Sequence, residues 1–146
     1  MPLKRILIWG GTALVVVSAG FLLIQLLPVD QPTNPPVVAE PAWDSPQTRA
    51  LAKRACFDCH SNEVVYPWYS YVAPVKWLVL RDVNDGRRAL NFSDWHPGGR
   101  ANGNRAARAI ANGQMPPTIY LPMHPSANLA DAEQQQLING LIASLK

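Results

Sequence analysis

The chain contains an unbroken apolar run, ILIWGGTALVVVSAGFLLIQLL, which extends from Ile6 to Leu27. The run has no charged side chain, and Gln25 is its only strongly polar residue. As an α-helix it would be about 33 Å long, at about 1.5 Å per residue, which is enough to cross the hydrocarbon core of a bilayer. A helix that is apolar on every side has no polar face for water, unlike a surface helix of a soluble domain. The run therefore predicts a transmembrane helix.

A cleavable signal peptide is the alternative interpretation of this run. The apolar region of a signal peptide is usually about 7–15 residues long and ends at a small-x-small cleavage site. Here the run is longer and is followed by a proline, so we favour an uncleaved anchor over residues 1–28. Lys4 and Arg5 precede the run, and the positive-inside rule places them in the cytoplasm. In a bacterium, this predicts a single-pass inner-membrane protein whose other residues lie in the periplasm.

The anchor is followed by a segment that is rich in proline. Six prolines occur between Pro28 and Pro46, with few aliphatic residues to build a core. In polyproline II form such a segment rises about 3 Å per residue, so it could act as a spacer of up to about 55 Å. Plain disorder is the alternative and would tether the domain equally well. The chain thus divides into an anchor (1–28), a proline-rich linker (29–45) and a domain (46–146).

The domain has helical periodicity and no run that alternates convincingly as a β-strand. Helices are expected over about residues 46–59, 74–86, 100–112 and 130–145. Gly86 is expected to end or bend the second helix, and Gly113 to stop the third. Because Ala130 has no side-chain acceptor, Asp131 or Asn128 is expected to cap the last helix. The predicted fold class is all-α, with helices joined by proline-rich loops.

The two cysteines of the chain belong to one motif, Cys56-Phe57-Asp58-Cys59-His60. A disulfide between Cys56 and Cys59 would close almost no loop and would stabilise little. Two thiols at this spacing can each add to one of the two vinyl groups of a porphyrin edge, and His60 can then stand over the iron. C-x-x-C-H is typical of c-type haem attachment, with the histidine as an axial ligand. The sequence therefore predicts one covalent haem c.

Two other chemistries use a similar cysteine pair. A thioredoxin-like dithiol requires a βαβ context, which the helical pattern does not provide. A structural zinc site requires a second pair of ligands at zinc spacing. The remaining histidines, His96 and His124, are far apart in the sequence. Covalent haem is the favoured interpretation.

The second axial position of such an iron has several candidates. Met115 stands before two prolines, which hold the backbone extended and can present a thioether at a fixed place. A methionine opposite a histidine raises the reduction potential, as suits an electron carrier. His124 lies in a second proline-rich loop and is the main alternative, followed by Met123 and His96. An ordinary packing role for Met115 also remains open.

The motif and its surroundings resemble a known family, the exported haem-binding domain proteins, which are similar to short c-type cytochromes. The resemblance is carried by CFDCHSNEVVYPWYSYVAPVKWLV, DVNDGRRALNFSDW and GQMPPTIYLPMHPSANL, and it covers about residues 45–146. It implies a small all-α, cytochrome c-like domain with haem c on Cys56 and Cys59. His60 would be the proximal ligand and Met115 the distal one. Ala130 departs from the usual capping Ser or Thr, at a cost of about 1 kcal/mol.

Arginine and aromatic residues are the remaining candidates for contacts with the haem. One or two arginines are expected to pair with the propionates, and the others to be solvated or to face an acidic redox partner. These are Arg81, Arg87, Arg88, Arg100, Arg105 and Arg108. Aromatic residues are expected either to line the haem or to form ordinary core, namely Trp68, Tyr69, Tyr71, Trp77 and Trp95.

Charge narrows the choice of partners. Beyond Leu27 there are eleven lysines and arginines against ten aspartates and glutamates, so the exported part is nearly neutral. This balance offers no footprint for nucleic acid. The predicted function is a membrane-anchored periplasmic monohaem cytochrome domain that transfers single electrons and is not itself an enzyme. The alternative is a haem-based sensor or a peroxidase-like enzyme with an open sixth iron position.

Overall fold

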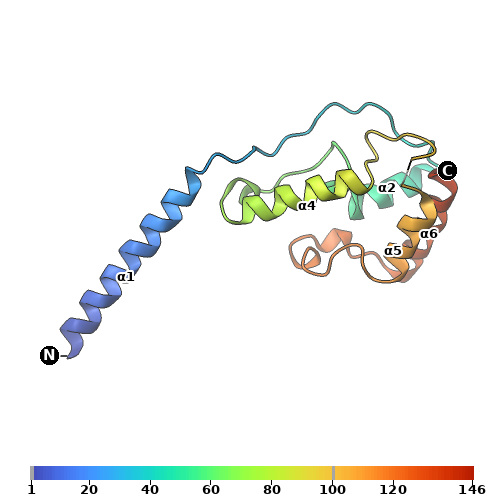
Figure 1. The fold of residues 1–146 in the computed structure, drawn as a ribbon. Helices are drawn as coiled ribbons and strands as arrows, with labels where there is room; N and C mark the ends of the chain where they lie inside the picture. The colour runs from blue at the N-terminus through green and yellow to red at the C-terminus, as the bar shows by residue number, and fades with distance from the viewer. Residues whose placement is uncertain (1, 100) are drawn as a thin grey trace. The chain divides into compact units, whose positions relative to one another are not determined.

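The protein is described by a computed structural model that covers residues 2–99 and 101–146. Figure 1 shows a helical chain, as the sequence predicts. The α-helices are α1 (Pro2–Gln25), α2 (Pro46–Ala55), α3 (Phe57–His60), α4 (Val75–Ala89), α5 (Gly103–Ala111) and α6 (Asp131–Ser144). The 3₁₀ helices are η1 (Trp68–Tyr71), η2 (Leu121–Met123) and η3 (Pro125–Ala127). Within these described ranges there is no β-strand, only one isolated parallel bridge between Ala39 and Asp94.

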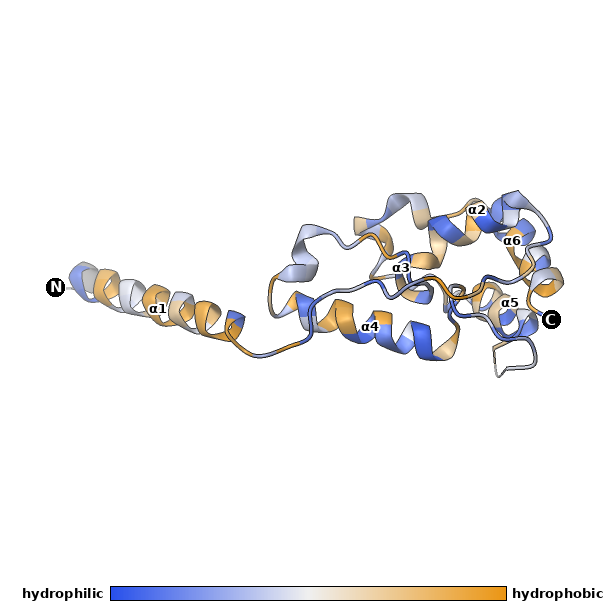
Figure 2. Cartoon of the chain, turned by 90° about the horizontal axis from the view of Figure 1, so that it is seen from above, coloured by the Kyte–Doolittle hydropathy of each residue, from blue (hydrophilic) through white to orange (hydrophobic). Residues whose placement is uncertain are grey.

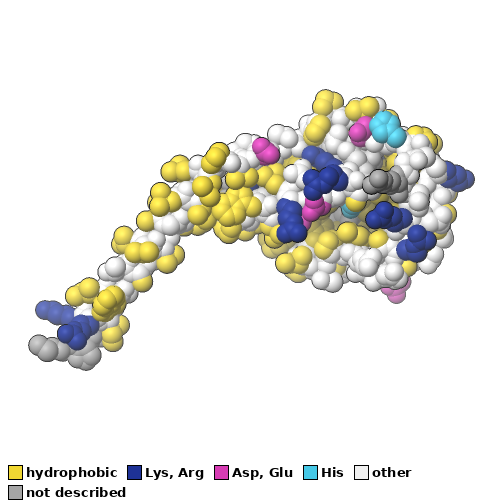
Figure 3. Space-filling model, in the orientation of Figure 1, with side chains coloured by type: hydrophobic (Ala, Val, Ile, Leu, Met, Phe, Trp, Pro, Cys, Tyr) yellow, Lys and Arg dark blue, Asp and Glu magenta, His cyan; other side chains and the backbone are white. Residues whose placement is uncertain are grey.

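The chain forms two compact units. The first unit contains the residues up to Pro32 together with Pro67–Leu80, and the second contains Thr33–Tyr66 together with Arg81–Lys146. Helix α1 belongs to the first unit, and its span Lys4–Gln25 is long and apolar enough to cross a membrane. Figure 3 shows hydrophobic side chains along α1, with Lys and Arg only near its amino-terminal end.

Helix α2 begins where the sequence indicates. Ser45 is its N-cap and accepts a hydrogen bond from the Thr48 backbone N–H at 3.1 Å, while Pro46 occupies the first turn. The helix then ends at Ala55, because the backbone of Cys56 leaves the helical region at φ −130°. The haem motif is therefore a separate single turn, α3, and not the end of a continuous first helix as expected.

Helices α4 and α5 differ from expectation in their bounds. Gly86 does not end α4, which continues to Ala89. Helix α5 is capped by Asn102, whose side chain accepts from the Arg105 backbone N–H at 3.0 Å. The expected start at Arg100 lies outside the described residues. The expected stop is confirmed, because Gly113 adopts φ +66°, a conformation that glycine allows without a steric penalty.

Helix α6 begins without a side-chain cap. Ala130 is its N-cap residue, so the expectation of a cap by Asp131 or Asn128 is wrong. The Glu133 carboxylate instead accepts a hydrogen bond from the Ala130 backbone N–H at 3.0 Å. This is the half of a capping box that does not require a hydroxyl at the N-cap position.

The core of the second unit joins α2, α3, α5 and α6. Buried aliphatic residues come from α2 and α6, including Leu51, Leu137 and Leu141. The rings of Phe57 and Phe92 stack on each other with centroids 5.4 Å apart. This aromatic pair places the haem motif directly against the core.

The linker is not the free spacer that its prolines suggested. The Asn34 side chain bonds both backbone groups of Val64, at 2.8 and 3.1 Å. Further along, the Trp95 N–H donates to the Ala39 carbonyl at 3.0 Å. Linker residues 34–39 thus lie along the second unit, held by the Asn34 side chain on the Val64 backbone and by a backbone hydrogen bond between Trp95 and Ala39.

Candidate functional site

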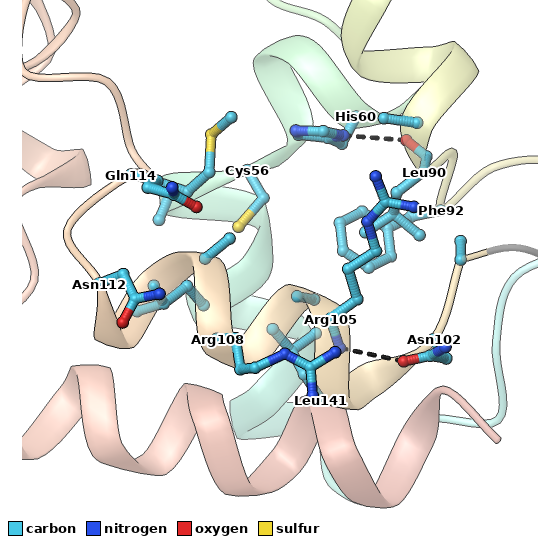
Figure 4. A pocket seen from close by; sticks show the side chains of 17 residues that line it. Cys56, His60, Leu90, Phe92, Asn102, Arg105, Arg108, Asn112, Gln114 and Leu141 are labelled. Atoms are coloured by element: carbon cyan, nitrogen blue, oxygen red, sulfur yellow. Dashed lines mark hydrogen bonds between the residues drawn. The ribbon is translucent and has the colours of Figure 1, made fainter.

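A cavity of about 400 Å³ lies in the second unit beside the haem motif. This size is within the usual range for sites that hold small molecules and cofactors, about 300–1,000 Å³. Its walls are mainly apolar and come from α2, α3, α5, α6 and the loops that follow α4 and α5 (Figure 4). The walls include Ala55, Cys56, His60, Leu90, Phe92, Arg105, Arg108, Ile110, Met115 and Leu141.

His60 is held in a defined orientation at this cavity. Its Nδ1 atom lies 3.0 Å from the carbonyl oxygen of Leu90, drawn as a dashed line in Figure 4. A protonated Nδ1 that donates to this carbonyl leaves Nε2 with its lone pair free, which is the form in which histidine binds a metal. Burial lowers the pKa of His60 because it penalises the imidazolium ion, although the carbonyls of Leu90 and Gly86 act in the opposite direction. The imidazole is therefore kept neutral.

The carbonyl partner of His60 is supplied by Leu90, which directly follows α4. The Phe92 backbone N–H also donates to the His60 carbonyl at 2.8 Å. The chain that leaves α4 therefore holds both the backbone and the ring of His60.

Helix α4 can approach the motif closely because residue 86 is glycine. A Cβ atom at Gly86 would overlap the carbonyl oxygen of Cys59 and lie 2.9 Å from its carbonyl carbon. Next to this contact, the Arg87 Nε donates to the Ser61 carbonyl at 2.8 Å. The carboxyl-terminal half of α4 thus packs directly on the backbone of the haem motif.

The two cysteines are free thiols, and Cys56 lines the cavity. Cys59 is not among the lining residues and lies instead against Gly86. Burial, with a smaller effect of Cys59, raises the pKa of Cys56 to about 12. Burial, followed by the carboxylates of Asp82 and Asp58, raises the pKa of Cys59 to about 11.

Met115 lies on the same cavity as His60. The backbone N–H groups of Gln114 and Met115 both donate to the Ala109 carbonyl, at 2.9 and 3.1 Å. Gly113 makes the turn that permits this reversal at the end of α5. The methionine backbone is therefore fixed by the helix end as well as by the prolines that follow it.

The other candidates for the distal position lie elsewhere. His124 stacks on Tyr120, with ring centroids 3.8 Å apart and planes 8° from parallel, and it does not line the cavity. Met123 is 64% exposed, and His96 is an exposed loop residue beside Asp94. The structure thus brings Cys56, His60 and Met115 to one cavity and leaves these three candidates outside it.

The arginine and aromatic candidates divide between the cavity and other places. Arg105 and Arg108, both from α5, line the cavity, while Arg81 and Arg88 pair with Asp85 on the surface of α4. Of the aromatic candidates none lines the cavity; Trp95 belongs to the buried core, and the lining ring is Phe92.

Sequence reasoning missed a contact that ties the Met115 loop to the haem motif. The Tyr120 hydroxyl donates to the Asp58 carboxylate at 2.6 Å, although the two residues are 62 positions apart. The second Asp58 oxygen accepts from the Val65 backbone N–H at 3.2 Å. Asp58 is one of the two variable positions of the motif, so nothing in the motif pattern points to this role.

The residues around the cavity fit a haem group. A neutral imidazole with one nitrogen already bonded suits an axial position, and a thiol and a thioether stand on the same cavity. The apolar walls suit a porphyrin face, and the Arg105 and Arg108 guanidinium groups suit its carboxylates.

A comparison with protein families agrees with this geometry. The model of one family, described as a haem-binding domain, matches residues 19–143. The match begins inside α1, earlier than the sequence resemblance, and includes the linker and the haem motif. No curated protein and no solved structure matches the chain.

Proposed function

The chain belongs to the haem-binding domain family, and from this premise we propose that it is a membrane-anchored c-type cytochrome domain that transfers single electrons. One haem would be attached through thioether bonds to Cys56 and Cys59, with His60 and Met115 as the axial ligands. The observation that carries the proposal is the pairing of His60 with the Leu90 carbonyl at the wall of a cavity that Met115 shares.

The haem supplies the one-electron chemistry when it is bound, and the protein sets the conditions for it. The Leu90 carbonyl holds the tautomer and orientation of the His60 ring. The apolar side chains of Phe92, Ile110 and Leu141 line the cavity and would shield a bound porphyrin face from water. A thioether from Met115 would favour the reduced iron and raise the potential.

The proposed location follows from α1 and the residues around it. Lys4 and Arg5 at the start of α1 favour a cytoplasmic amino terminus, so the haem domain would lie in the periplasm of a bacterium. The exposed arginines of α5, Arg105 and Arg108, would face both the haem carboxylates and an acidic redox partner.

Covalent attachment is tested by denaturing electrophoresis of the full chain, matured with haem in membranes. Haem should stay with the polypeptide after denaturation. It should be lost from the double variant Cys56→Ser/Cys59→Ser, because a serine cannot form the thioether. Retention of haem by the native chain only before denaturation would show a non-covalent haem protein and would overturn the c-type assignment.

The axial ligands are tested by the ferric and ferrous optical spectra of the same preparation. A low-spin spectrum with the weak far-red sulfur-to-iron band is expected, and Met115→Ala should abolish the band. Met123→Ala is the matched control, since that methionine lies outside the cavity, and it should leave the band unchanged.

Two results would contradict methionine ligation. Loss of the low-spin spectrum in His124→Ala, with Met115→Ala unaffected, would assign the distal position to His124. A high-spin ferric spectrum in the native protein, with ready binding of carbon monoxide to the ferrous form, would show an open iron. The function would then be that of a sensor or a peroxidase-like enzyme.

A further inference from the structure

The end of α1 is bonded to a segment far along the chain. Gln25, the last residue of α1, donates from its side-chain Nε2 to the Ala73 carbonyl at 3.1 Å. The Ala73 N–H in turn donates to the Gln25 side-chain oxygen at 2.9 Å. A further contact joins the Lys76 Nζ to the Val29 carbonyl at 3.4 Å. These contacts lie within the first unit and fix Pro67–Leu80 at the end of α1.

The segment fixed in this way exposes large apolar and aromatic side chains. They are Trp68 at 75%, Tyr71 at 54%, Val75 at 42% and Leu78 at 48% of their full exposure. Val75 and Leu78 are one turn apart at the start of α4 and so share one of its faces. Such a group on a soluble surface is unusual and typically marks an interaction site. We call these four side chains the aromatic surface.

The charge of the segment indicates what the aromatic surface contacts. Pro67–Leu80 contains no acidic residue, and its one basic residue, Lys76, is buried with its ammonium group at the Val29 carbonyl. Apart from the buried Lys76, the charged residues of α4 begin at Arg81 and dominate its second half, a change of hydropathy along the helix that Figure 2 shows. A surface that binds a protein usually has a polar or charged rim around its apolar centre. A surface that contacts lipid does not require such a rim.

The position of the segment points to lipid. It is bonded to the end of the helix that can cross the membrane, where that helix would leave the hydrocarbon core. Tryptophan and tyrosine are enriched at this depth, because their rings are apolar while their N–H and O–H groups bond to water and headgroups. The apolar surface of α1 is thus continued by side chains of the type found at the membrane interface.

We propose that the aromatic surface is a lipid-contact site, which inserts Trp68 and Tyr71 into the headgroup region of the leaflet in which α1 ends. This inference rests on the membrane anchoring in the proposed function. It adds a second attachment of the chain to the bilayer, made by a segment that follows the haem motif in sequence.

The test uses the full chain, matured with haem and reconstituted in vesicles of phosphatidylethanolamine and phosphatidylglycerol. A photoreactive benzoylphenylalanine is placed at one position at a time, replacing Trp68, Tyr71, Leu14 or Ile119. Leu14 lies within α1 and reports on insertion of the anchor. Ile119 belongs to the second unit and is the matched control, because its side chain is 77% exposed, close to the 75% of Trp68. After illumination, mass spectrometry counts the chains that carry a phospholipid adduct.

Adducts are expected at positions 14, 68 and 71, with several-fold fewer at position 119. Adducts at position 14 without adducts at 68 and 71 would overturn the lipid-contact site and leave the anchor in place. If no position forms adducts, α1 does not insert in the membrane, and both the proposed anchor and the lipid-contact site would be overturned. Cross-links from position 68 to a second copy of the chain would show a protein interface and overturn the inference.

Discussion

At the scale of single residues, Gly86 shows how the haem motif is held. A glycine inside a helix costs about 1 kcal/mol relative to alanine, and α4 nevertheless continues through it. The reason is the contact with Cys59, whose carbonyl occupies the space of a side chain at position 86. This close contact positions the end of α4 so that the carbonyl of Leu90, the next residue, lies within hydrogen-bond distance of the His60 ring.

Replacement of this glycine should therefore loosen the motif. Gly86→Ala is expected to lower the free energy of unfolding by about 1–3 kcal/mol, because the added methyl group must displace α4 or the Cys59 backbone. Denaturant unfolding followed by circular dichroism measures the change. Asn84→Ala, at an exposed position of the same helix, is the control and should be neutral. Equal stability of the two variants would contradict the close contact.

The Tyr120–Asp58 hydrogen bond gives a second prediction at this scale. Tyr120→Phe removes the donor to the Asp58 carboxylate and should cost about 1 kcal/mol, since hydrogen bonds of this kind contribute about that much. Because this bond ties the Met115 loop to the motif, the sulfur-to-iron band should also weaken. Tyr71→Phe removes an exposed hydroxyl and should change neither quantity. A Tyr120→Phe variant with a full band and native stability would show that the bond does not position the loop.

The local sequence was sufficient to predict the motif residues but not their supports. Cys56, Cys59 and His60 form a contiguous pattern, so they can be recognised as a candidate haem-attachment motif without a structure. Leu90 and Tyr120 act through a backbone carbonyl and a long-range contact. Any residue type can supply a carbonyl, and no spacing rule links residues 58 and 120.

At the scale of secondary-structure elements, glycines set the packing of α6. A Cβ atom at Gly140 would overlap the side chain of Thr48 in α2, and one at Gly103 in α5 would overlap the Leu141 carbonyl. Helix α6 can therefore lie close to both neighbours. An exposed pair between Arg54 and Glu133 also connects α2 with α6, but exposed ion pairs contribute little.

The crossing of α2 and α6 can be tested by a double-mutant cycle. Gly140→Ala should destabilise the domain by about 1–3 kcal/mol through overlap with Thr48. Thr48→Ala removes the overlapping hydroxyl and methyl groups, so the cost of Gly140→Ala should be smaller in its presence. Unfolding in denaturant measures the four stabilities. Strict additivity of the two substitutions would contradict a contact between them, and Asn139→Ala serves as the control on the neighbouring exposed position.

Helix type could be predicted from the sequence, but helix ends only in part: the start of α2 and the stop of α5 were predicted, whereas the end of α2 and that of α4 were not. Apolar periodicity predicted helices in the regions of α2, α4 and α6, because it reflects the face that each helix buries, and an alanine-rich composition predicted α5. The continuation of α4 through Gly86 and the break before α3 depend on tertiary contacts. Local propensity does not contain those contacts, so both were misplaced.

At the scale of the whole molecule, a charged pair joins the linker to the rest of the second unit. The Arg49 guanidinium donates to the Glu40 carboxylate, at 2.7 Å from its Nε, and this hydrogen bond is the main reason that the pKa of Glu40 is lowered below 4.5. Arg49 also lies over the Phe57 ring, 5.4 Å from its centroid. The proline content of the linker suggested a free spacer. This prediction failed because composition alone does not show which distant residues will form hydrogen bonds with a segment.

This pair predicts a dependence of stability on pH. Since the pKa of Glu40 is lower in the folded than in the unfolded chain, its stabilisation is full above 4.5 and is lost as the pH falls through the lowered folded value. Glu40→Gln should therefore be less stable than the native chain at neutral pH, by up to about 1 kcal/mol. The difference should vanish in acid, as measured by urea unfolding at a series of pH values. Asp30→Asn is the control. If the stability difference between Glu40→Gln and the native chain persisted unchanged in acid, the lowered pKa of Glu40 would not be its cause.

The cavity shares its walls with the hydrophobic core, since Ala55, Phe92, Ile110 and Leu141 belong to both. A newly made chain that has not bound haem would thus have an incompletely packed interior on one side. Such a chain would open more readily and would be cut more readily by proteases. The abundance of this protein would then follow the haem supply of the cell, even if its synthesis were constant.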